Sequence, residues 1–289
     1  MAAPIAFADP RRFGESVEAA QLSDSAFAFL SEFVHRHCGI VLGEHKRQLV
    51  QGRLRRRLRV LGLDSFDAYA NRLRNDPGSE VEELTSAIST NVTAFFRESH
   101  HYELLADSLL PQWLAARPAR LRLWSAGCAT GEEAYALAML LAETLEKSGS
   151  KVDARILATD LSARALAVAR TGSYPVDRLD GVSEARRQRW FVNDEQPHTL
   201  RVHPQLRERV AFQPLNLLHD WPMHGPFDAI FCRNVVIYFD KVTKMRLFER
   251  FASLLPVGGY LFLGHSESMH GLSDAFELVG RTVYRKHAP

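Results

Sequence analysis

The stretch Leu-Arg-Leu-Trp-Ser-Ala-Gly-Cys-Ala-Thr-Gly-Glu-Glu, residues 121–133, decides the fold class of this chain. A short apolar run leads into a turn with two glycines, and a helical pattern follows. This order is typical of a βα unit in a parallel sheet, where ligands bind at the carboxyl ends of the strands. Glycines let a ligand approach the backbone, and the first N–H groups of a helix lack partners within the helix.

The residues around this turn indicate the charge of the ligand. A dinucleotide-binding turn typically reads Gly-x-Gly-x-x-Gly and seats a pyrophosphate on the helix N–H groups. Here Gly127 and Gly131 have the spacing Gly-x-x-x-Gly, and Glu132 and Glu133 follow where a phosphate would lie. The acids favour a cationic ligand, such as the amino or sulfonium group of S-adenosylmethionine. Alternatively, they only suit the helix dipole.

Further βα units follow this one. Apolar runs predict strands near 121–126, 155–159, 210–213, 227–232 and 260–264, helices over 131–147, 162–170 and 241–255, and a closing hairpin at 276–279 and 282–285. Residues 121–289 are therefore expected to form an α/β domain around a mostly parallel sheet. Glycine, proline, charged residues and a short alternating run interrupt the pattern at 172–209, where we expect an inserted subdomain.

The first part of the chain has a different pattern. Apolar residues recur every three or four positions over residues 22–89, for example Val50, Leu54 and Leu58, which predicts an all-helical domain. Residues 1–21 show no periodicity and are expected to be a poorly ordered lead-in. Residues 90–120 are expected to form a linker and a connecting helix.

The composition is that of an ordinary globular protein. Among 289 residues, 46% are apolar and 24% charged, and neither a signal peptide nor an apolar run of membrane-spanning length occurs. We therefore expect a cytoplasmic protein without membrane insertion. The three cysteines form no CxxC pair, so we expect reduced core thiols and no metal site. Nothing requires more than a monomer.

A local basic segment lies within the helical part. Residues 46–59 carry seven basic side chains and no acidic one, although residues 1–90 as a whole carry twelve of each sign. If Val50, Leu54, Leu58 and Leu61 face inward, helical geometry points Arg55, Arg56 and Arg59 outward and leaves Arg53 and Arg57 on the flanks. This face either docks a locally acidic partner or is simply solvated.

Two further stretches place polar residues just beyond strands. Asp160 follows the second strand, where an acid typically accepts hydrogen bonds from ribose hydroxyls, or else it caps the next helix. Residues 227–240 read Phe-Asp-Ala-Ile-Phe-Cys-Arg-Asn-Val-Val-Ile-Tyr-Phe-Asp. Tyr238 either faces the reacting centre or is a half-buried aromatic residue, and Asp240 is expected to cap a helix. The Asn-Pro-Pro-Tyr-like motif of many nucleic-acid amino methyltransferases is missing here.

The linker carries the stretch Asn-Val-Thr-Ala-Phe-Phe-Arg-Glu at residues 91–98. The adjacent phenylalanines are expected to anchor the linker. Asn91 and Thr93 either contribute to a site or cap the helix that follows, and Arg97 either contributes to a site or pairs with Glu98 or Glu103. Alone, the segment does not decide between a site and a structural role.

Five motifs together resemble the CheR chemotaxis methyltransferases. They lie at residues 91–98, 124–133, 214–218 (Pro-Leu-Asn-Leu-Leu), 227–240 and 264–268 (Gly-His-Ser-Glu-Ser), and the resemblance extends over about residues 22–286. It implies a class I S-adenosylmethionine-dependent methyltransferase fold, Rossmann-like, with an N-terminal all-helical domain. It also implies that the insertion at 172–209 is a small β subdomain.

The resemblance also implies a set of site residues. Those expected at the cofactor are Asn91, Thr93, Arg97, Gly127, Glu132, Glu133, Asp160, Asn216, Leu217, Arg233 and Asn234. One of the two adjacent glutamates would hold the methionine ammonium, Asp160 the ribose, and residues 216–217 the adenine end. Arg97 and Tyr238 are the candidates for orienting the acceptor.

The implied reaction transfers a methyl group from S-adenosylmethionine to receptor glutamates, giving glutamyl methyl esters and S-adenosylhomocysteine. The expected partners are the cytoplasmic methylation helices of chemoreceptors, which would dock on Arg53, Arg55, Arg56 and Arg59. A receptor tail peptide at the β subdomain is a further expected partner. Two alternatives remain: an S-adenosylmethionine sensor or scaffold without transferase activity, and a nucleic-acid methyltransferase, which the lack of aromatic residues among these arginines disfavours.

Overall fold

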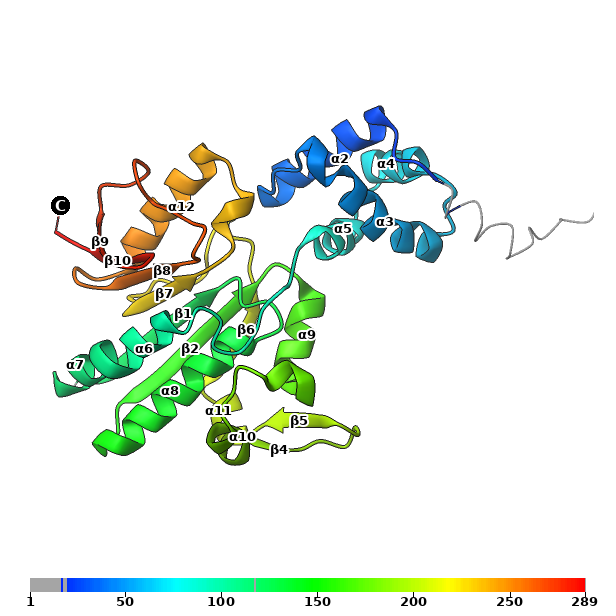
Figure 1. Cartoon of the computed structure of the whole chain (residues 1–289). Coiled ribbons are helices and arrows are strands. Elements are labelled where there is room, and N and C mark those ends of the chain that lie inside the picture. Colours follow the sequence, from blue (N-terminus) through cyan, green and yellow to red (C-terminus); the bar gives the residue numbers. More distant parts are fainter. Residues whose placement is uncertain (1–16, 18–19, 117, 289) are drawn as a thin grey trace, which may run out of the picture. The chain divides into compact units, whose positions relative to one another are not determined.

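The structure is a computed structural model that describes residues 17, 20–116 and 118–288. The chain divides into two compact units, residues 1–90 and 91–289 (Figure 1). The lead-in expected over residues 1–21 falls almost entirely outside the described residues. No helix of the described segments is long and apolar enough to cross a membrane.

The first unit is built from helices. They are α2 (Asp24–Cys38), the 3-10 turn η1 (Glu44–Lys46), α3 (Arg47–Leu61), α4 (Phe66–Asn75) and α5 (Glu80–Ile88). The side chains of Ser23 and Ser65 cap α2 and α4, and Gly62 ends α3 in the left-handed conformation. Val50 and Leu54 are fully buried, as the three- and four-residue spacing predicts. The all-helical prediction for this part of the chain is confirmed.

The second unit is built on a seven-stranded sheet in the order β6-β2-β1-β7-β8-β10-β9. Its strands are β1 (Arg120–Ala126), β2 (Asp153–Asp160), β6 (Val210–Pro214), β7 (Ala229–Cys232), β8 (Tyr260–Leu263), β9 (Phe276–Gly280) and β10 (Val283–Lys286). The first five strands in spatial order pair in parallel, and the closing hairpin adds two antiparallel strands. The mostly parallel sheet is therefore confirmed.

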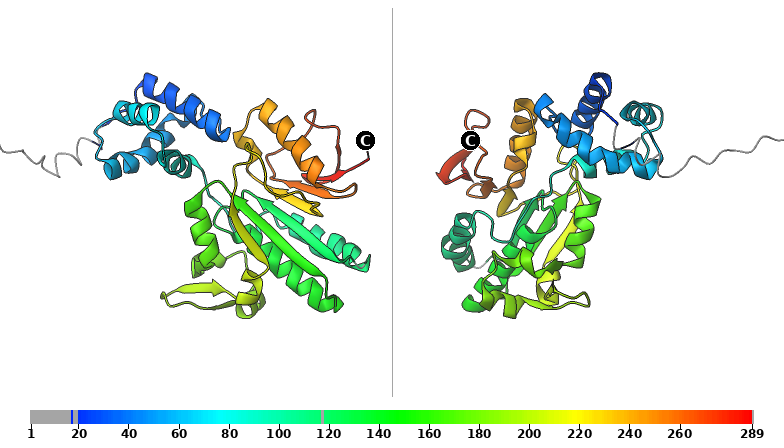
Figure 2. Two further views of the ribbon diagram at one scale, coloured as in Figure 1. Left: turned by 180° about the vertical axis from the view of Figure 1, so that it is seen from behind. Right: turned by 45° about the vertical axis from the view of Figure 1, so that its right-hand side comes forward.

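Helices cover both faces of this sheet (Figure 2). They are α6 (His100–Leu104), the π-helical turn η2 (Leu105–Leu109), α7 (Leu110–Ala115), α8 (Glu132–Ser148), α9 (Ala163–Thr171) and α12 (Lys241–Leu254). Successive β1 side chains face opposite ways, so that Leu123 packs with α8 in one cluster and Trp124 packs with α12 in the other. Packing of the helices on both faces fixes the positions of the strands, whose ends carry the polar motifs.

The insertion at 172–209 forms its own three-stranded antiparallel sheet. It contains β3 (Ser173–Pro175), η3 (Val176–Leu179), α10 (Glu184–Trp190), β4 (Phe191–Asn193), β5 (Thr199–Val202) and α11 (Pro204–Arg207). The order β3-β5-β4 makes β4 an edge strand. The insertion is fixed to α8 because Arg186 and the indole N–H of Trp190 both donate to the Glu143 carboxylate.

Several predicted strand ends are wrong by one or two residues, and two of them have a clear local cause. β7 begins at Ala229 because the N–H of Phe227 donates to the Leu254 carbonyl at the end of α12 instead of to a neighbouring strand. β10 begins at Val283 because Thr282 has a φ of 52° and belongs to the hairpin turn. The three cysteines are buried and free, as expected of core thiols.

Candidate functional site

The glycine turn after β1 is built by close packing. Gly127 has a φ of 94°, and its N–H donates to the Thr159 carbonyl of β2. A Cβ at this position would lie 2.4 Å from Cγ2 of Val235 in the loop after β7. The turn therefore needs glycine both for its backbone conformation and for the approach of another loop. It brings the carboxyl ends of β1, β2 and β7 together.

The two glutamates that follow the turn point to different neighbours. Glu132 is fully buried and pairs with Arg178 of the insertion, and its other oxygen accepts from the Thr130 hydroxyl at 2.6 Å. Glu133 accepts from the Ser125 hydroxyl at 2.7 Å and from Arg233 at 3.1 Å. Burial raises the pKa of the Glu133 carboxyl, against the opposing effect of the Arg233 charge.

Asp160, at the end of β2, stabilises the glycine turn by hydrogen bonds. One carboxylate oxygen accepts from the Ala129 N–H at 2.7 Å and the other from the Ser162 N–H at 2.8 Å. Burial raises the pKa of the Asp160 carboxyl. The cap of α9 is Ser162, whose hydroxyl accepts from the Ala165 N–H, so the alternative of Asp160 as the helix cap is wrong. The Leu161 backbone also hydrogen-bonds this carboxylate, so about one of its four acceptor sites is left for a hydroxyl donor.

Asn216 and Leu217 follow β6 beside Asp160. The N–H of Leu215 donates to the Asp160 carbonyl at 3.0 Å, which places the loop after β6 at the end of β2. The Asn216 side chain accepts from the Leu218 N–H at 3.0 Å and shapes this loop. Leu217 is buried, so this position offers an apolar surface beside a carboxylate.

Arg233 joins three segments at the end of β7. Its guanidinium contacts Glu98 at 3.2 Å, Glu133 at 3.1 Å and the hydroxyl of Tyr102 at 3.1 Å, and it donates to the carbonyl of Arg97. Burial by itself lowers the pKa of Arg233, but the neighbouring acidic groups outweigh it and raise the pKa above its usual value. The residue therefore stays charged and holds the 91–98 segment against α8.

Sequence reasoning missed the role of Glu98. It has a φ of 59°, and its carboxylate accepts from His265 at 2.9 Å and from the Asn234 amide at 3.3 Å. Burial raises the pKa of Glu98, but the His265 hydrogen bond and the Arg233 charge together lower it to about 2. In the sequence, the place of Glu98 in the 91–98 motif could have suggested that it belongs to the site. Its partners could not be foreseen, because they lie more than 130 residues away.

The rest of the 91–98 segment forms neither helix nor strand, turns at residues 95–96, and is anchored by aromatic packing. Phe95 is buried and meets Tyr174 and Phe191 of the insertion edge to face, which confirms the expected anchoring. Helix α6 begins at His100, so the suggestion that residues 91 and 93 cap the following helix is wrong. Asn91 and Thr93 are both partly exposed. The guanidinium of Arg97 donates to the Val92 carbonyl at 3.0 Å.

The loop between β7 and α12 carries the remaining predicted residues. Asn234 has a φ of 60°, and Tyr238 ends the 3-10 turn η4 (Val236–Tyr238) with a half-buried ring. The carboxylate of Asp240 accepts from the Thr243 N–H at 2.8 Å and caps α12, as expected. The carboxyl end of the sheet thus gathers several of the predicted residues: Gly127, Glu133, Asp160, Asn216, Arg233 and Asn234.

Comparison with known proteins decides the family. Residues 91–285 match the model of the CheR methyltransferase SAM binding domain, and residues 25–89 match that of the CheR methyltransferase all-alpha domain. The chain belongs to the CheR methyltransferase family. It is thus a methyltransferase with the class I fold, and S-adenosylmethionine is its cofactor.

Several relatives of this CheR methyltransferase are similar over most of their length. The chemotaxis protein methyltransferase of Klebsiella aerogenes is 44% identical over 91% of this chain and 90% of its own. That of Escherichia coli is 42% identical over 93% of both chains. The chemotaxis protein methyltransferase 2 of Pseudomonas aeruginosa is 45% identical over 89% of this chain and 91% of its own.

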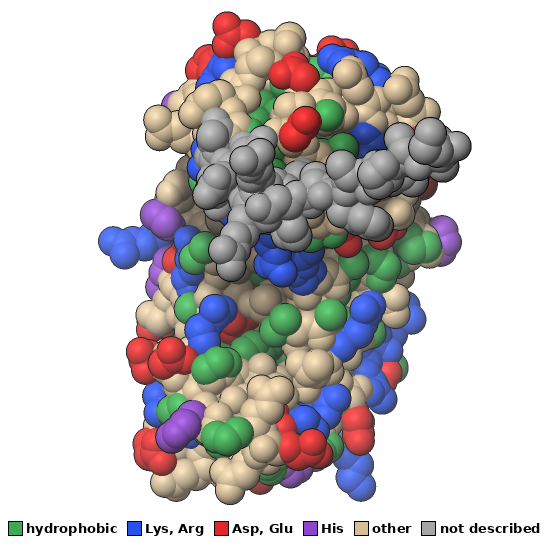
Figure 3. Space-filling model, turned by 90° about the vertical axis from the view of Figure 1, so that its right-hand side faces the viewer, with side chains coloured by type: hydrophobic (Ala, Val, Ile, Leu, Met, Phe, Trp, Pro, Cys, Tyr) green, Lys and Arg blue, Asp and Glu red, His purple; other side chains and the backbone are tan. Residues whose placement is uncertain are grey.

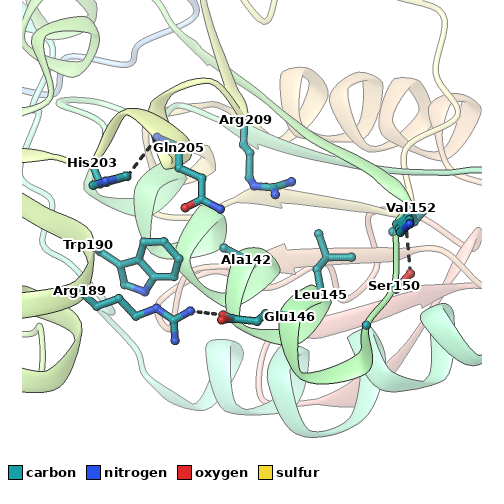
Figure 4. A pocket seen from close by; sticks show the side chains of 12 residues that line it. Ala142, Leu145, Glu146, Ser150, Val152, Arg189, Trp190, His203, Gln205 and Arg209 are labelled. Carbon is teal, nitrogen blue, oxygen red and sulfur yellow. Dashed lines mark hydrogen bonds and ion pairs between the residues drawn. The ribbon is translucent and has the colours of Figure 1, made fainter.

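The structure also has a pocket at the opposite end of the sheet (Figure 4). It lies before β2 and β6, where Val152 and Arg209 precede these strands, and Trp190 of the insertion forms another wall. Arg189 and Glu146 in its lining pair with each other. None of the residues that line the pocket belongs to the five family motifs, and the pocket lies at the amino ends of the strands.

The four arginines predicted to dock a partner all lie on α3 and differ in exposure. Arg56 and Arg59 are exposed, as predicted, but Arg55 is half-buried because its guanidinium reaches back to the Ala20 carbonyl. Arg53 donates to the Ile88 and Ser89 carbonyls at the end of α5. On the face shown in Figure 3, basic side chains lie among acidic and apolar ones and form no continuous basic surface.

Proposed function

We propose that this CheR methyltransferase transfers methyl groups from S-adenosylmethionine to glutamate carboxylates of bacterial chemoreceptors. The observation that carries this proposal is the set of buried carboxylates at the carboxyl end of the sheet, inside a chain that matches the family over both of its domains. The relatives' description as chemotaxis protein methyltransferases supports chemoreceptors as the substrate.

We assign the methionine ammonium to Glu133. Glu132 has Arg178 as its own cationic partner, whereas Glu133 shares Arg233 with Glu98, so more negative charge remains for a second cation. Two carboxylates around one guanidinium favour an additional positive group. The neighbouring Gly127 turn lets the ligand approach the backbone without a side chain in the way.

The remaining residues fit the nucleoside half of the cofactor. Asp160 can accept from a ribose hydroxyl, since its carboxylate retains an acceptor site beside its three backbone contacts. Asn216 and Leu217 offer an amide and an apolar surface to the adenine end. Completing the proposed cofactor set are Asn91, Thr93, Arg97, Arg233 and Asn234.

The chemistry requires alignment more than acid–base catalysis. When bound, S-adenosylmethionine supplies an electrophilic methyl group on a positively charged sulfur. The acceptor glutamate has a reference pKa of about 4.3 and is therefore ionised at neutral pH, so no general base is needed. Its oxygen forms a bond to the methyl carbon as the carbon–sulfur bond breaks, which gives the methyl ester and S-adenosylhomocysteine. Arg97 and Tyr238 orient the acceptor and help to exclude water.

Receptor docking is assigned to surfaces of both units. The exposed arginines Arg56 and Arg59 of α3, flanked by Arg53 and Arg55, would meet the acidic methylation helices of the receptor. Edge strand β4 of the insertion has an unpaired side that an extended receptor tail peptide could extend by β-augmentation. In this proposal residues 22–89 serve docking, residues 121–289 together with the 91–98 segment serve catalysis, and the protein acts in the cytoplasm as a monomer.

Methyl transfer to a chemoreceptor cytoplasmic fragment tests the proposed function. Labelled S-adenosylmethionine is incubated with the enzyme and either the fragment or a version whose candidate glutamates are alanine. We expect base-labile label on the fragment and none on the alanine version. Tight cofactor binding without transfer to any receptor would favour the sensor or scaffold, and steeply salt-dependent nucleic-acid binding with methylation would favour the nucleic-acid enzyme.

A further inference from the structure

The motif Gly-His-Ser-Glu-Ser contains a buried carboxylate that the proposed chemistry does not use. Glu267 is 5% exposed, and its carboxylate accepts from the main-chain N–H groups of Asn234 at 2.8 Å, Ile237 at 3.1 Å and Gly264 at 2.5 Å. Three backbone donors from two separate segments therefore converge on this one carboxylate. Two of these donors belong to the loop between β7 and α12.

This loop contains a residue with positive φ. Asn234 is in the left-handed conformation, with a φ of 60°. The turn after β8 packs directly on it, because a Cβ at Gly264 would lie 2.7 Å from the Asn234 nitrogen. Glu267 therefore binds the loop and the turn together at the point where they touch.

Other contacts hold the first part of the loop without Glu267. Arg233 is held by Glu98, Glu133 and Tyr102, and the Asn234 side chain donates to Glu98. The turn Val236–Tyr238 follows this part of the loop, and its Ile237 N–H donates to Glu267. Glu267 thus also holds the backbone directly before Tyr238.

We propose that Glu267 is a positioning residue for methyl transfer: its carboxylate fixes the 234–237 backbone and so sets the place of Tyr238 beside the acceptor. The inference rests on the proposed function of Tyr238. A glutamine at position 267 has nearly the same size, but it replaces one acceptor oxygen by an NH₂ donor that would face backbone N–H groups. An aspartate keeps both acceptors on a shorter side chain.

The test compares Glu267→Gln and Glu267→Asp with Asp228→Asn as a matched control. Asp228 is a partly buried carboxylate at the opposite end of β7 and accepts from the Arg122 N–H at 2.8 Å. We expect Glu267→Gln to lower kcat at least tenfold while the Kd for S-adenosylmethionine changes less than threefold, and Glu267→Asp to recover part of kcat. Asp228→Asn should lower Tm and leave kcat within twofold of wild type.

Equal kcat losses in Glu267→Gln and Asp228→Asn, or a cofactor affinity that falls as far as kcat, would overturn the inference. Amide hydrogen exchange over residues 233–240 provides a readout independent of the receptor: it should accelerate at least tenfold in Glu267→Gln and stay unchanged in Asp228→Asn. Failure of the wild-type enzyme to methylate any receptor would instead reject the proposed function, and unchanged exchange in Glu267→Gln would still reject the role of Glu267.

Discussion

Tyr238 ends a 3-10 turn after β7, and its hydroxyl is the group assigned to the acceptor carboxylate. Replacing it by phenylalanine keeps the ring and removes one hydrogen bond to a charged group, which is worth about 1.5–3 kcal/mol. We therefore expect Tyr238→Phe to slow transfer roughly 10- to 100-fold and to change cofactor affinity little. Single-turnover transfer and calorimetry measure the two effects, and equal losses would remove Tyr238 from the acceptor side.

His101 makes the stability of the second unit depend on pH. It is fully buried, its Nε2 donates to the Arg281 carbonyl, and burial together with the Arg233 charge lowers its pKa from 6.5 to about 4. Between pH 4 and pH 6.5 the unfolded chain binds this proton more readily than the folded chain. The free energy of unfolding is therefore highest, as far as His101 is concerned, above about pH 6.5, and it falls as the pH drops towards 4. Titration of His101 alone should lower the free energy of unfolding by about 1–2 kcal/mol between pH 7 and pH 5.

Thermal unfolding of wild type and His101→Gln checks this. All four tryptophans, at positions 113, 124, 190 and 221, lie in the second unit, so their fluorescence follows that unit. Glutamine retains a donor for the Arg281 carbonyl and does not titrate. We expect a smaller decrease in Tm for the variant from pH 7 to pH 5, and parallel pH profiles would contradict the assignment.

At the level of residues, the sequence predicted which groups stand at the strand ends but not how they pair. Asp160 and the adjacent glutamates were expected there because polar residues followed apolar runs. Their partners were not foreseen, since Arg178 is 46 positions from Glu132 and Arg233 is 100 positions from Glu133. Such pairings depend on tertiary contacts that no local pattern encodes.

At the level of elements, apolar runs and helical spacing predicted the strands and helices, because burial on one or both faces decides both patterns. The predictions were wrong where a local contact outweighed the pattern, as at Phe227 and Thr282. The amphipathic pattern of α3 correctly predicted its buried side. It could not predict that Arg55 folds back to a backbone carbonyl or that Arg57 forms a two-bond pair with Glu80.

The exposed face of α3 leads to a prediction on receptor docking. The double change Arg56→Glu and Arg59→Glu replaces two exposed cations by anions opposite an acidic partner, so we expect the receptor KM to rise about tenfold or more. The Kd for S-adenosylmethionine should stay the same. Arg36→Glu with Arg72→Glu changes the net charge equally on other helices of the unit and is the control. The same increase in receptor KM in both double variants would show only a general effect of net charge.

At the level of the whole molecule, one sheet has two ends with different properties. The carboxyl ends of its strands carry the glycine turn, the buried acids and the family motifs, and ligands bind at this end in open α/β sheets. The amino ends carry a pocket with none of these features. Helix α8 runs between the two ends, with Glu133 in its first turn and Glu146 in its last, roughly 20 Å apart at 1.5 Å per residue.

This helix provides the most direct test of where the cofactor binds. Glu133→Gln and Glu146→Gln make the same chemical change on the same helix, and calorimetry measures the Kd for S-adenosylmethionine in each. The account predicts that Glu133→Gln raises the Kd at least tenfold while Glu146→Gln leaves it within twofold of wild type. A Kd that is unchanged in Glu133→Gln, or that rises as much in Glu146→Gln, would contradict the placement of the cofactor at the carboxyl end of the sheet.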